Sequence, residues 1–239
     1  MGALSTFEYV HDGVALRGEL ATPAGPGPHP AILVMHDAHG LGAVVRERAA
    51  RLAQAGYVAL ATDMYGEGRL FTKSQDAGAP FMQLQETPGL LRGRALAGLE
   101  ALRALPQVDS GRIGAIGFCF GGQCVLELAR SGADVRAVVS FHGLLKTREP
   151  AQPGAVKAKV LVLTGAKDPY APLEDVGGFQ DEMIAAGADW QLTTYGEALH
   201  AFTDPLAETK NVPGVRYDPL VDKLSWAQAT AFLEVTVRG

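Results

Sequence analysis

One cysteine lies where a predicted strand turns sharply into a predicted helix. The apolar run 112–116 is followed by Gly-Phe-Cys-Phe-Gly-Gly at 117–122, and residues 123–129 then have a helical pattern. Glycine allows a strained turn and a close approach of the backbone, so its presence on both sides of Cys119 has a physical reason. Alone, a cysteine is more often a core residue. The glycines favour a nucleophile instead.

A nucleophilic thiol needs a base, and the base needs an orienting acid. Asp168 follows the apolar run 160–164, and His200 follows the run 190–195. Taken singly, Asp168 would be a turn residue and His200 a surface or packing residue. The order of nucleophile, acid and histidine, each just past a predicted strand, is typical of α/β-hydrolases. We therefore expect Cys119, Asp168 and His200 to form a catalytic triad.

The elements around these residues alternate between short apolar strands and longer helices. Predicted strands cover 31–35, 57–62, 112–116, 135–141, 160–164 and 190–195, and predicted helices cover 46–55, 90–105, 123–130, 176–186 and 223–235. This alternation predicts an α/β fold, with a mostly parallel central sheet and helices on both faces. Residues 14–21 suggest an antiparallel entry strand. The length of the chain favours one domain, 1–239.

Three long segments show no periodic pattern, at 66–88, 144–158 and 203–219. We interpret them as connections within the domain. Sites in open α/β sheets lie beyond the carboxyl ends of the strands, so the first and third segments are candidates for pocket walls or a lid. Variable surface decoration is the alternative.

The chain resembles the dienelactone hydrolase family from about Val14 to the final helix. The resemblance is carried by the 117–122 motif, by the segments 35–41, 63–66 and 140–143, by the Asp168 loop and by Leu-His-Ala-Phe at 199–202. It implies the α/β-hydrolase fold, a triad of Cys119, Asp168 and His200, and no cofactor.

The resemblance also implies an acid that contacts the resting thiol and helps to take its proton, and this position is Asp37. The alternative is a loop residue that caps a helix near Val44. Residues 36–39 include metal-compatible side chains, but no further ligand spacing supports a metal site. The backbone N–H groups of Ala38 and Phe120 are the expected oxyanion hole.

Three further side chains are candidates for the pocket lining: Phe118, His142 and Phe202. Simple core packing would also explain each of them. Relatives that bind an anionic dienelactone carry an arginine soon after the histidine, whereas this chain has Asp204 there, which would repel a carboxylate. Arg69, Arg92 or Arg94 could supply the charge, although the sequence aims none of them at the pocket.

The predicted function is hydrolysis of a lactone or carboxylic ester through a thioester of Cys119. The resemblance points to an enol lactone of the dienelactone type, opened to the oxo acid. A broad carboxylesterase or lactonase acting on aryl or short-chain esters is the alternative. Two other classes stay open: a redox sensor that uses Cys119 and Cys124, and a binding protein without turnover.

The composition of the chain excludes some classes of partner. The net charge of −5 and the pI of about 5.7 provide no basic surface for nucleic acid. No apolar run is long enough for a membrane span, and residues 1–13 lack the pattern of a secretory signal. We expect a cytoplasmic protein that acts on a small ester or lactone, without nucleic acid or membrane. Its oligomeric state is open, and a monomer is compatible with the sequence.

Overall fold

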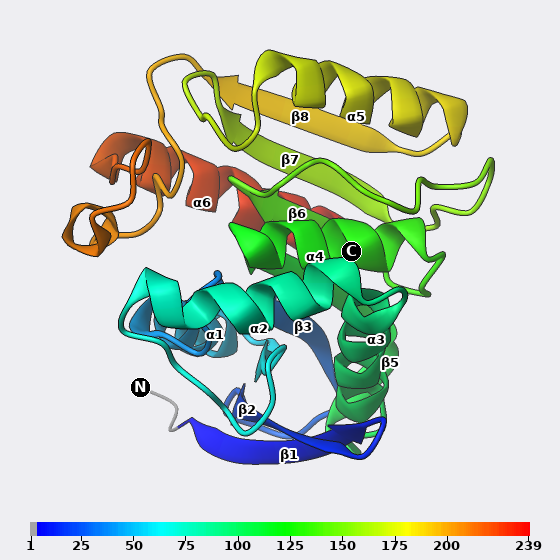
Figure 1. Ribbon diagram of the computed structural model, residues 1–239. Helices are drawn as coiled ribbons and strands as arrows, with labels where there is room; N and C mark the ends of the chain where they lie inside the picture. Colours follow the sequence, from blue (N-terminus) through cyan, green and yellow to red (C-terminus); the bar gives the residue numbers. More distant parts are fainter. Residues whose placement is uncertain (1–3) are drawn as a thin grey trace.

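One eight-stranded sheet runs through the molecule (Figure 1). The computed structural model describes residues 4–239. Residues 1–3, which belong to the predicted domain and to the stretch 1–13 compared above with a secretory signal, lie outside it. The strand order is β1-β2-β4-β3-β5-β6-β7-β8. The strands are β1 (Ser5–His11), β2 (Val14–Ala21), β3 (His29–Met35), β4 (Val58–Thr62), β5 (Val108–Phe118), β6 (Ala137–Phe141), β7 (Lys159–Gly165) and β8 (Trp190–Tyr195).

The six strands from β3 to β8 are parallel, and β1 and β2 form an antiparallel hairpin at one edge. The mostly parallel sheet and the antiparallel entry strand are thus confirmed. Strand β1 was not predicted. Of its residues only Tyr9 is buried, so this edge strand has no apolar run by which it could be recognised.

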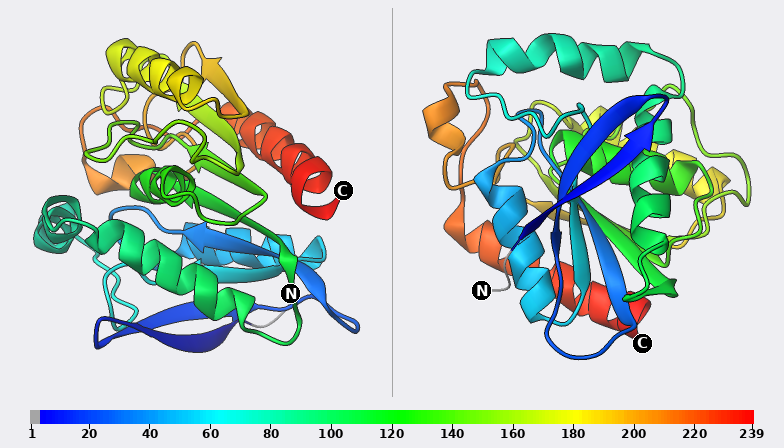
Figure 2. Two further views of the ribbon diagram at one scale, coloured as in Figure 1. Left: turned by 90° about the vertical axis from the view of Figure 1, so that its right-hand side faces the viewer. Right: turned by 90° about the horizontal axis from the view of Figure 1, so that it is seen from below.

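Helices cover both faces of the sheet, as predicted (Figure 2). They are α1 (Ala43–Gln54), α2 (Ser74–Glu86), α3 (Leu90–Arg103), α4 (Phe120–Arg130), α5 (Leu173–Ala185) and α6 (Pro219–Leu233), with short turns η1 (Ala207–Lys210) and η2 (Glu234–Arg238). Residues of α3, α4 and α5 share one core cluster. Those of α1 and α6 pack in a second cluster on the opposite face. None of the helices within 4–239 has the length and apolarity to cross a lipid bilayer.

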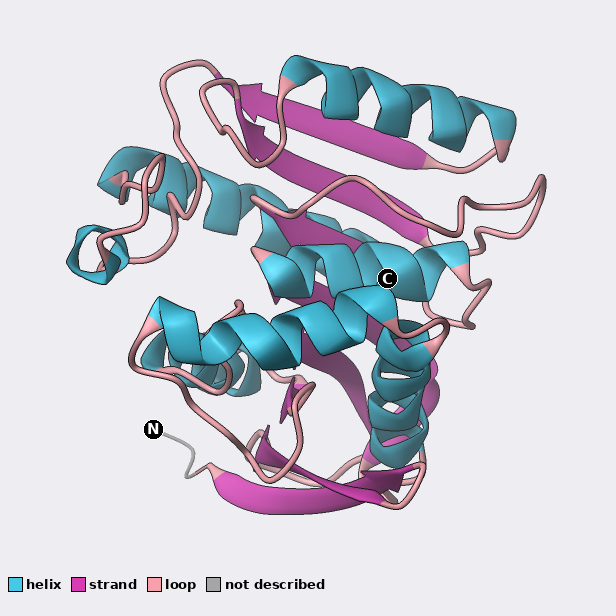
Figure 3. Ribbon diagram, in the orientation of Figure 1, coloured by secondary structure: helices cyan, strands magenta, loops and turns pink. Residues whose placement is uncertain are grey.

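The prediction of an irregular segment at 66–88 is wrong for most of its length, because α2 occupies 74–86 (Figure 3). Gly78 and Pro80 lie inside this helix and weaken its helical signal. Only Ala77 and Leu84 are buried in it. Leu84 belongs to the core, and Phe81 packs against it. This tertiary packing stabilises a helix that local propensity does not favour.

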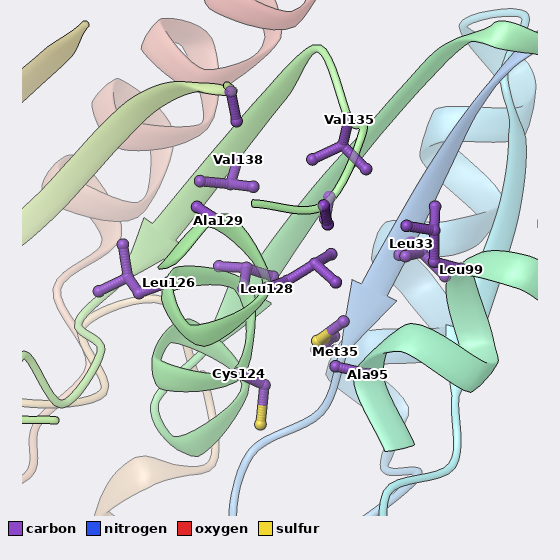
Figure 4. Packing of buried hydrophobic residues seen from close by; sticks show 14 of the residues in the cluster. Leu33, Met35, Ala95, Leu99, Cys124, Leu126, Leu128, Ala129, Val135 and Val138 are labelled. Carbon is purple, nitrogen blue, oxygen red and sulfur yellow. The ribbon is translucent and has the colours of Figure 1, made fainter. Parts of the chain in front are cut away.

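The helix after the cysteine is buried along its whole length and begins at Phe120, three residues before its predicted start. Cys124, which lies within α4, is fully buried in the same cluster as Met35 and Ala95 (Figure 4). A buried α4 fixes the direction of the turn that precedes it. Cys119, at the apex of that turn, is therefore supported by a rigidly packed helix.

Candidate active site

The predicted site residues lie just past the carboxyl ends of neighbouring parallel strands. Cys119 follows β5, Asp168 follows β7 and His200 follows β8. Because parallel strands end at the same edge of the sheet, side chains from distant parts of the sequence meet there. The structure brings Cys119 and His200 together at one pocket, and Asp168 contacts His200.

Cys119 occupies the turn between β5 and α4 with a left-handed φ of +55°, which costs energy for a residue other than glycine. The backbone of Gly121 touches Gly117 and the end of β3 so closely that a side chain at either glycine would collide with main-chain atoms. The N–H of Cys119 donates to Phe141 O at 3.0 Å and to His142 Nδ1 at 3.1 Å. The strained turn is thus held by several contacts.

Asp168 and His200 form a hydrogen-bonded pair. Nδ1 of His200 lies 2.8 Å from Oδ2 of Asp168, and both residues are buried. The other carboxylate oxygen accepts the N–H of Tyr170 at 2.8 Å. The backbone N–H of His200 donates a hydrogen bond to Gly214 O at 3.1 Å, which fixes the position of the residue. This arrangement leaves Nε2 of the imidazole for the thiol.

The charge state of His200 depends on its neighbours. Burial alone would lower its pKa, but the Cys119 thiolate and the hydrogen bonds with Asp168 and Cys119 raise the pKa of His200 to about 10. The site therefore favours a protonated His200 beside the Cys119 sulfur. That pair supplies both a nucleophile and an acid.

His142 lines the same pocket, as predicted, and also contacts the turn at Cys119. Its Nδ1 accepts the N–H of Cys119, so Nε2 carries the proton and donates to Thr203 Oγ1 at 2.8 Å. Burial, together with the charge of His200, holds the pKa of His142 well below its usual range. His142 is therefore neutral, and its ring centroid lies 5.2 Å from that of His200.

The two expected oxyanion donors flank the cysteine. Phe120 begins α4, and Ala38 lies in the loop after β3. Within residues 4–239 neither N–H donates to a protein acceptor. Two unpaired donors of this kind can bind a developing oxyanion.

Asp37 is held by a lysine that was not predicted from the sequence. Its carboxylate contacts Lys210 Nζ at 2.8 Å and the N–H of His39 at 2.7 Å, and Lys210 also contacts Asp204 at 2.7 Å. Burial opposes ionisation of Asp37, but His39 and Lys210 outweigh it and lower its pKa. No hydrogen bond joins Asp37 to Cys119 within the described residues.

The pocket has a volume of about 450 Å³ and mostly apolar walls. Residues of α2 and of the 203–219 segment line it, so the first and third irregular segments are confirmed as pocket walls. Phe118 also lines it, but the prediction for Phe202 is wrong. That ring is fully buried behind His142, at 4.9 Å between ring centroids. The Phe120 ring packs inward between Tyr65 and Phe81.

The three candidate arginines serve elsewhere. Arg69 and Arg94 donate to the carbonyls of Tyr65 and Met64, each at 2.6 Å, and Arg92 pairs with Glu127 and Glu149. None of the three lines the pocket. Lys210 does line the pocket. Nothing in its local sequence marks it, because the fold of a long aperiodic segment decides where it lies.

The remaining candidate groups have other surroundings. Burial raises the pKa of the Cys124 thiol well above its usual range, which disfavours a second reactive thiol. Nε2 of His39 lies 3.1 Å from Ser74 Oγ. Over residues 4–239, no three or more His, Cys, Asp or Glu side chains are grouped to hold a metal ion.

Comparisons with known proteins agree with this geometry. The model of the dienelactone hydrolase family matches residues 16–237. A protein of Methylorubrum extorquens named "Putative carboxymethylenebutenolidase" is 30% identical over 206 residues, which cover 81% of this chain and 69% of that protein.

Two solved structures are similar over nearly their whole length. A dienelactone hydrolase-like promiscuous phosphotriesterase from metagenomic libraries has 36% identity and a TM-score of 0.92, and 98% of each chain is covered. A structure named m3DLH has 38% identity and a TM-score of 0.94, with the same coverage. The fold is therefore the α/β-hydrolase fold, and the chain is a hydrolase that belongs to the dienelactone hydrolase family.

Proposed function

We propose that the chain hydrolyses lactones or carboxylic esters through a covalent thioester on Cys119. The observation that carries the proposal is the connected series of Cys119, His200 and Asp168 beside two unpaired backbone N–H groups. Such a series provides a nucleophile, a proton carrier and an oxyanion site within one pocket.

In the first half of the reaction the thiolate attacks the substrate carbonyl carbon. The carbonyl oxygen gains negative charge and accepts hydrogen bonds from the N–H groups of Ala38 and Phe120. His200, as imidazolium, donates its Nε2 proton to the departing oxygen. The alcohol or enol leaves, and the acyl group remains on sulfur.

In the second half a water molecule cleaves the thioester. Neutral His200 takes a proton from this water, and Asp168 stabilises the imidazolium that forms. The thiolate is then expelled and the acid departs. Because a thiolate leaves more readily than an ordinary alkoxide, the first half favours substrates with a stabilised leaving oxygen, such as enol lactones and aryl esters.

The charges in the pocket favour a neutral substrate. Lys210 faces two carboxylates, Asp37 and Asp204, so this cluster carries a net negative charge. A carboxylate on the substrate would be repelled, and Arg69, Arg92 and Arg94 are not available to hold it. A neutral aryl ester or enol lactone fits best, and an anionic dienelactone fits less well.

A neutral phosphotriester is a second candidate substrate. It has no charge to be repelled by Asp37 and Asp204, and one similar solved structure is named a promiscuous phosphotriesterase. The same thiolate would attack phosphorus while the bond to the aryl oxygen breaks, and His200 would protonate the departing oxygen. The N–H groups of Ala38 and Phe120 would face the phosphoryl oxygen, and water activated by neutral His200 would then cleave the S–P bond and release the thiolate.

Initial rates on a 4-nitrophenyl ester, an anionic dienelactone and a neutral aryl phosphotriester will test the proposal. We expect fastest turnover of the aryl ester, and complete loss of turnover of all three in Cys119→Ala. Cys124→Ala is the matched control, because it removes the other, buried thiol and should leave turnover in place.

Retained ester hydrolysis in Cys119→Ala would contradict the covalent mechanism. A dienelactone rate above the aryl ester rate would contradict the preference for neutral substrates while leaving the triad in place. Loss of turnover in folded Cys124→Ala would contradict the assignment of the reaction to Cys119 alone.

A further inference from the structure

His36 is a fully buried histidine that takes no part in the proton transfers at Cys119. It is the first residue after β3 and precedes the loop that contains the Ala38 donor. Its Nδ1 lies 2.6 Å from the carbonyl oxygen of Asp37, and its Nε2 lies 3.1 Å from the backbone nitrogen of Met64.

These partners determine the protonation of the ring. A carbonyl oxygen only accepts, so Nδ1 carries a proton, and a backbone N–H only donates, so Nε2 is bare. Burial lowers the pKa of His36, in agreement with a neutral ring. His36 is therefore held as one tautomer, with its donor directed at Asp37.

The hydrogen bond from His36 Nδ1 to the Asp37 carbonyl orients the peptide that contains the oxyanion donor. The carbonyl of Asp37 and the N–H of Ala38 belong to the same peptide unit, which is trans. In a planar trans peptide these two groups point in opposite directions. Fixing the carbonyl on the buried imidazole consequently aims the N–H away from the core and toward the pocket.

The imidazole is itself rigidly supported. Met64, which donates to it, has its own carbonyl held by Arg94 at 2.6 Å. The Tyr65 ring packs at 5.0 Å from the ring of His36, and the Tyr65 hydroxyl donates to Ala38 O at 2.9 Å. Both peptides around Ala38 are thus attached to the turn after β4.

We propose that His36 is a positioning residue that orients the Asp37–Ala38 peptide, so that the N–H of Ala38 stabilises the oxyanion. This role rests on the proposed acyl transfer at Cys119. It predicts a loss in carbonyl chemistry and no loss in thiolate reactivity.

Two variants of similar size separate the donor from the packing. His36→Asn keeps an N–H donor near the Nδ1 position, whereas His36→Leu has nearly the same shape and no donor. Both lose the contact with Met64, so that loss cancels in the comparison. We expect kcat on the aryl ester to fall about 10-fold to 100-fold in His36→Leu and to stay within about fivefold of wild type in His36→Asn.

Alkylation of Cys119 by iodoacetamide, followed by mass spectrometry, is the second measurement. The thiolate forms a bond to carbon and iodide leaves, with no charge placed on a carbonyl oxygen. We expect equal alkylation rates in wild type and both variants. If His36→Leu does not fold, His36→Gln replaces it, because its longer amide serves the Met64 side and leaves the Asp37 carbonyl without its donor.

Equal kcat in the donor and donor-free variants would overturn the proposal. A parallel fall of alkylation and kcat would also overturn it, by assigning the effect to the thiol or to folding. Equal ester hydrolysis by wild type and Cys119→Ala would overturn the proposed function, and the role of His36 with it.

Discussion

At the scale of single residues, three buried histidines at this site differ in charge because their partners differ. His200 faces the Cys119 sulfur and the Asp168 carboxylate, which raise its pKa. His36 and His142 each accept a backbone N–H, which requires a bare nitrogen. Burial lowers the pKa of both. One residue type thus provides a proton carrier and two neutral supports.

Asp168→Asn tests the charge of His200. The carboxylate raises the pKa of His200, so its removal should lower that pKa and move the alkaline limb of kcat/KM to lower pH. In the wild type this limb should lie near pH 10, where the imidazolium loses its proton. Turnover near pH 7 should also fall at least about 100-fold, because the imidazole loses its orienting partner. Rates from about pH 6 to about 10.5 will measure both effects.

The matched control for this variant is Asp181→Asn, which makes the same change on the exposed side of α5. It should keep the wild-type profile. An unchanged alkaline limb in Asp168→Asn would show that the Asp168 carboxylate does not set the protonation of His200.

At the scale of elements, residues directly after a strand are easier to predict from the sequence than residues within a long connection. Cys119, Asp168 and His200 are recognisable because each comes soon after an apolar run. Phe202 was assigned to the wrong side of its segment, since an aperiodic stretch carries no signal for which side chains turn inward. Lys210 was missed for the same reason.

The pairing at Lys210 shows how a connection completes the site. Lys210 lies in η1 and joins the segment 203–219 to the loop after β3, through Asp204 and Asp37. Two loops from distant parts of the chain are thereby fixed across the pocket mouth. Only the folded chain reveals that the expected thiol-activating acid is bound to a lysine.

Asp204→Asn should improve turnover of an anionic lactone relative to a neutral ester. Asparagine keeps the oxygen that accepts the N–H of Leu206, and it leaves Asp37 and Lys210 as a balanced pair. The expected gain in the ratio of kcat/KM values is about tenfold, which corresponds to about 1.4 kcal/mol of repulsion removed. Initial rates on both substrates at low ionic strength will measure the ratio.

Glu208→Gln is the control for this charge change, because Glu208 is an exposed residue of η1. Its ratio should change by less than about twofold, since solvent screens exposed charges. A similar gain in both variants would indicate a general charge effect and contradict a specific role for Asp204.

At the scale of the whole molecule, an ion network joins the helices on one face of the sheet. Arg130, near the end of α4, contacts Glu127 at 2.9 Å and Glu182 of α5 at 2.7 Å, and Arg92 of α3 contacts Glu127 at 2.8 Å. The Arg130 side chain is 1% exposed. The helix that begins after Cys119 is thus anchored at its far end to both neighbours.

Arg130→Met should lower the free energy of unfolding by about 3 kcal/mol, because it leaves Glu127 and Glu182 buried with less compensation. For a chain of this length the melting temperature should fall by about 6 to 12 °C. Arg17→Met, which breaks an exposed pair with Glu8, should cost less than about 1 kcal/mol. Urea titrations will measure both.

The folded Arg130→Met protein should keep kcat within about twofold, because α4 separates the network from Cys119 by about 15 Å. A large fall in kcat without a loss of stability would mean that the network acts on the site rather than on the fold.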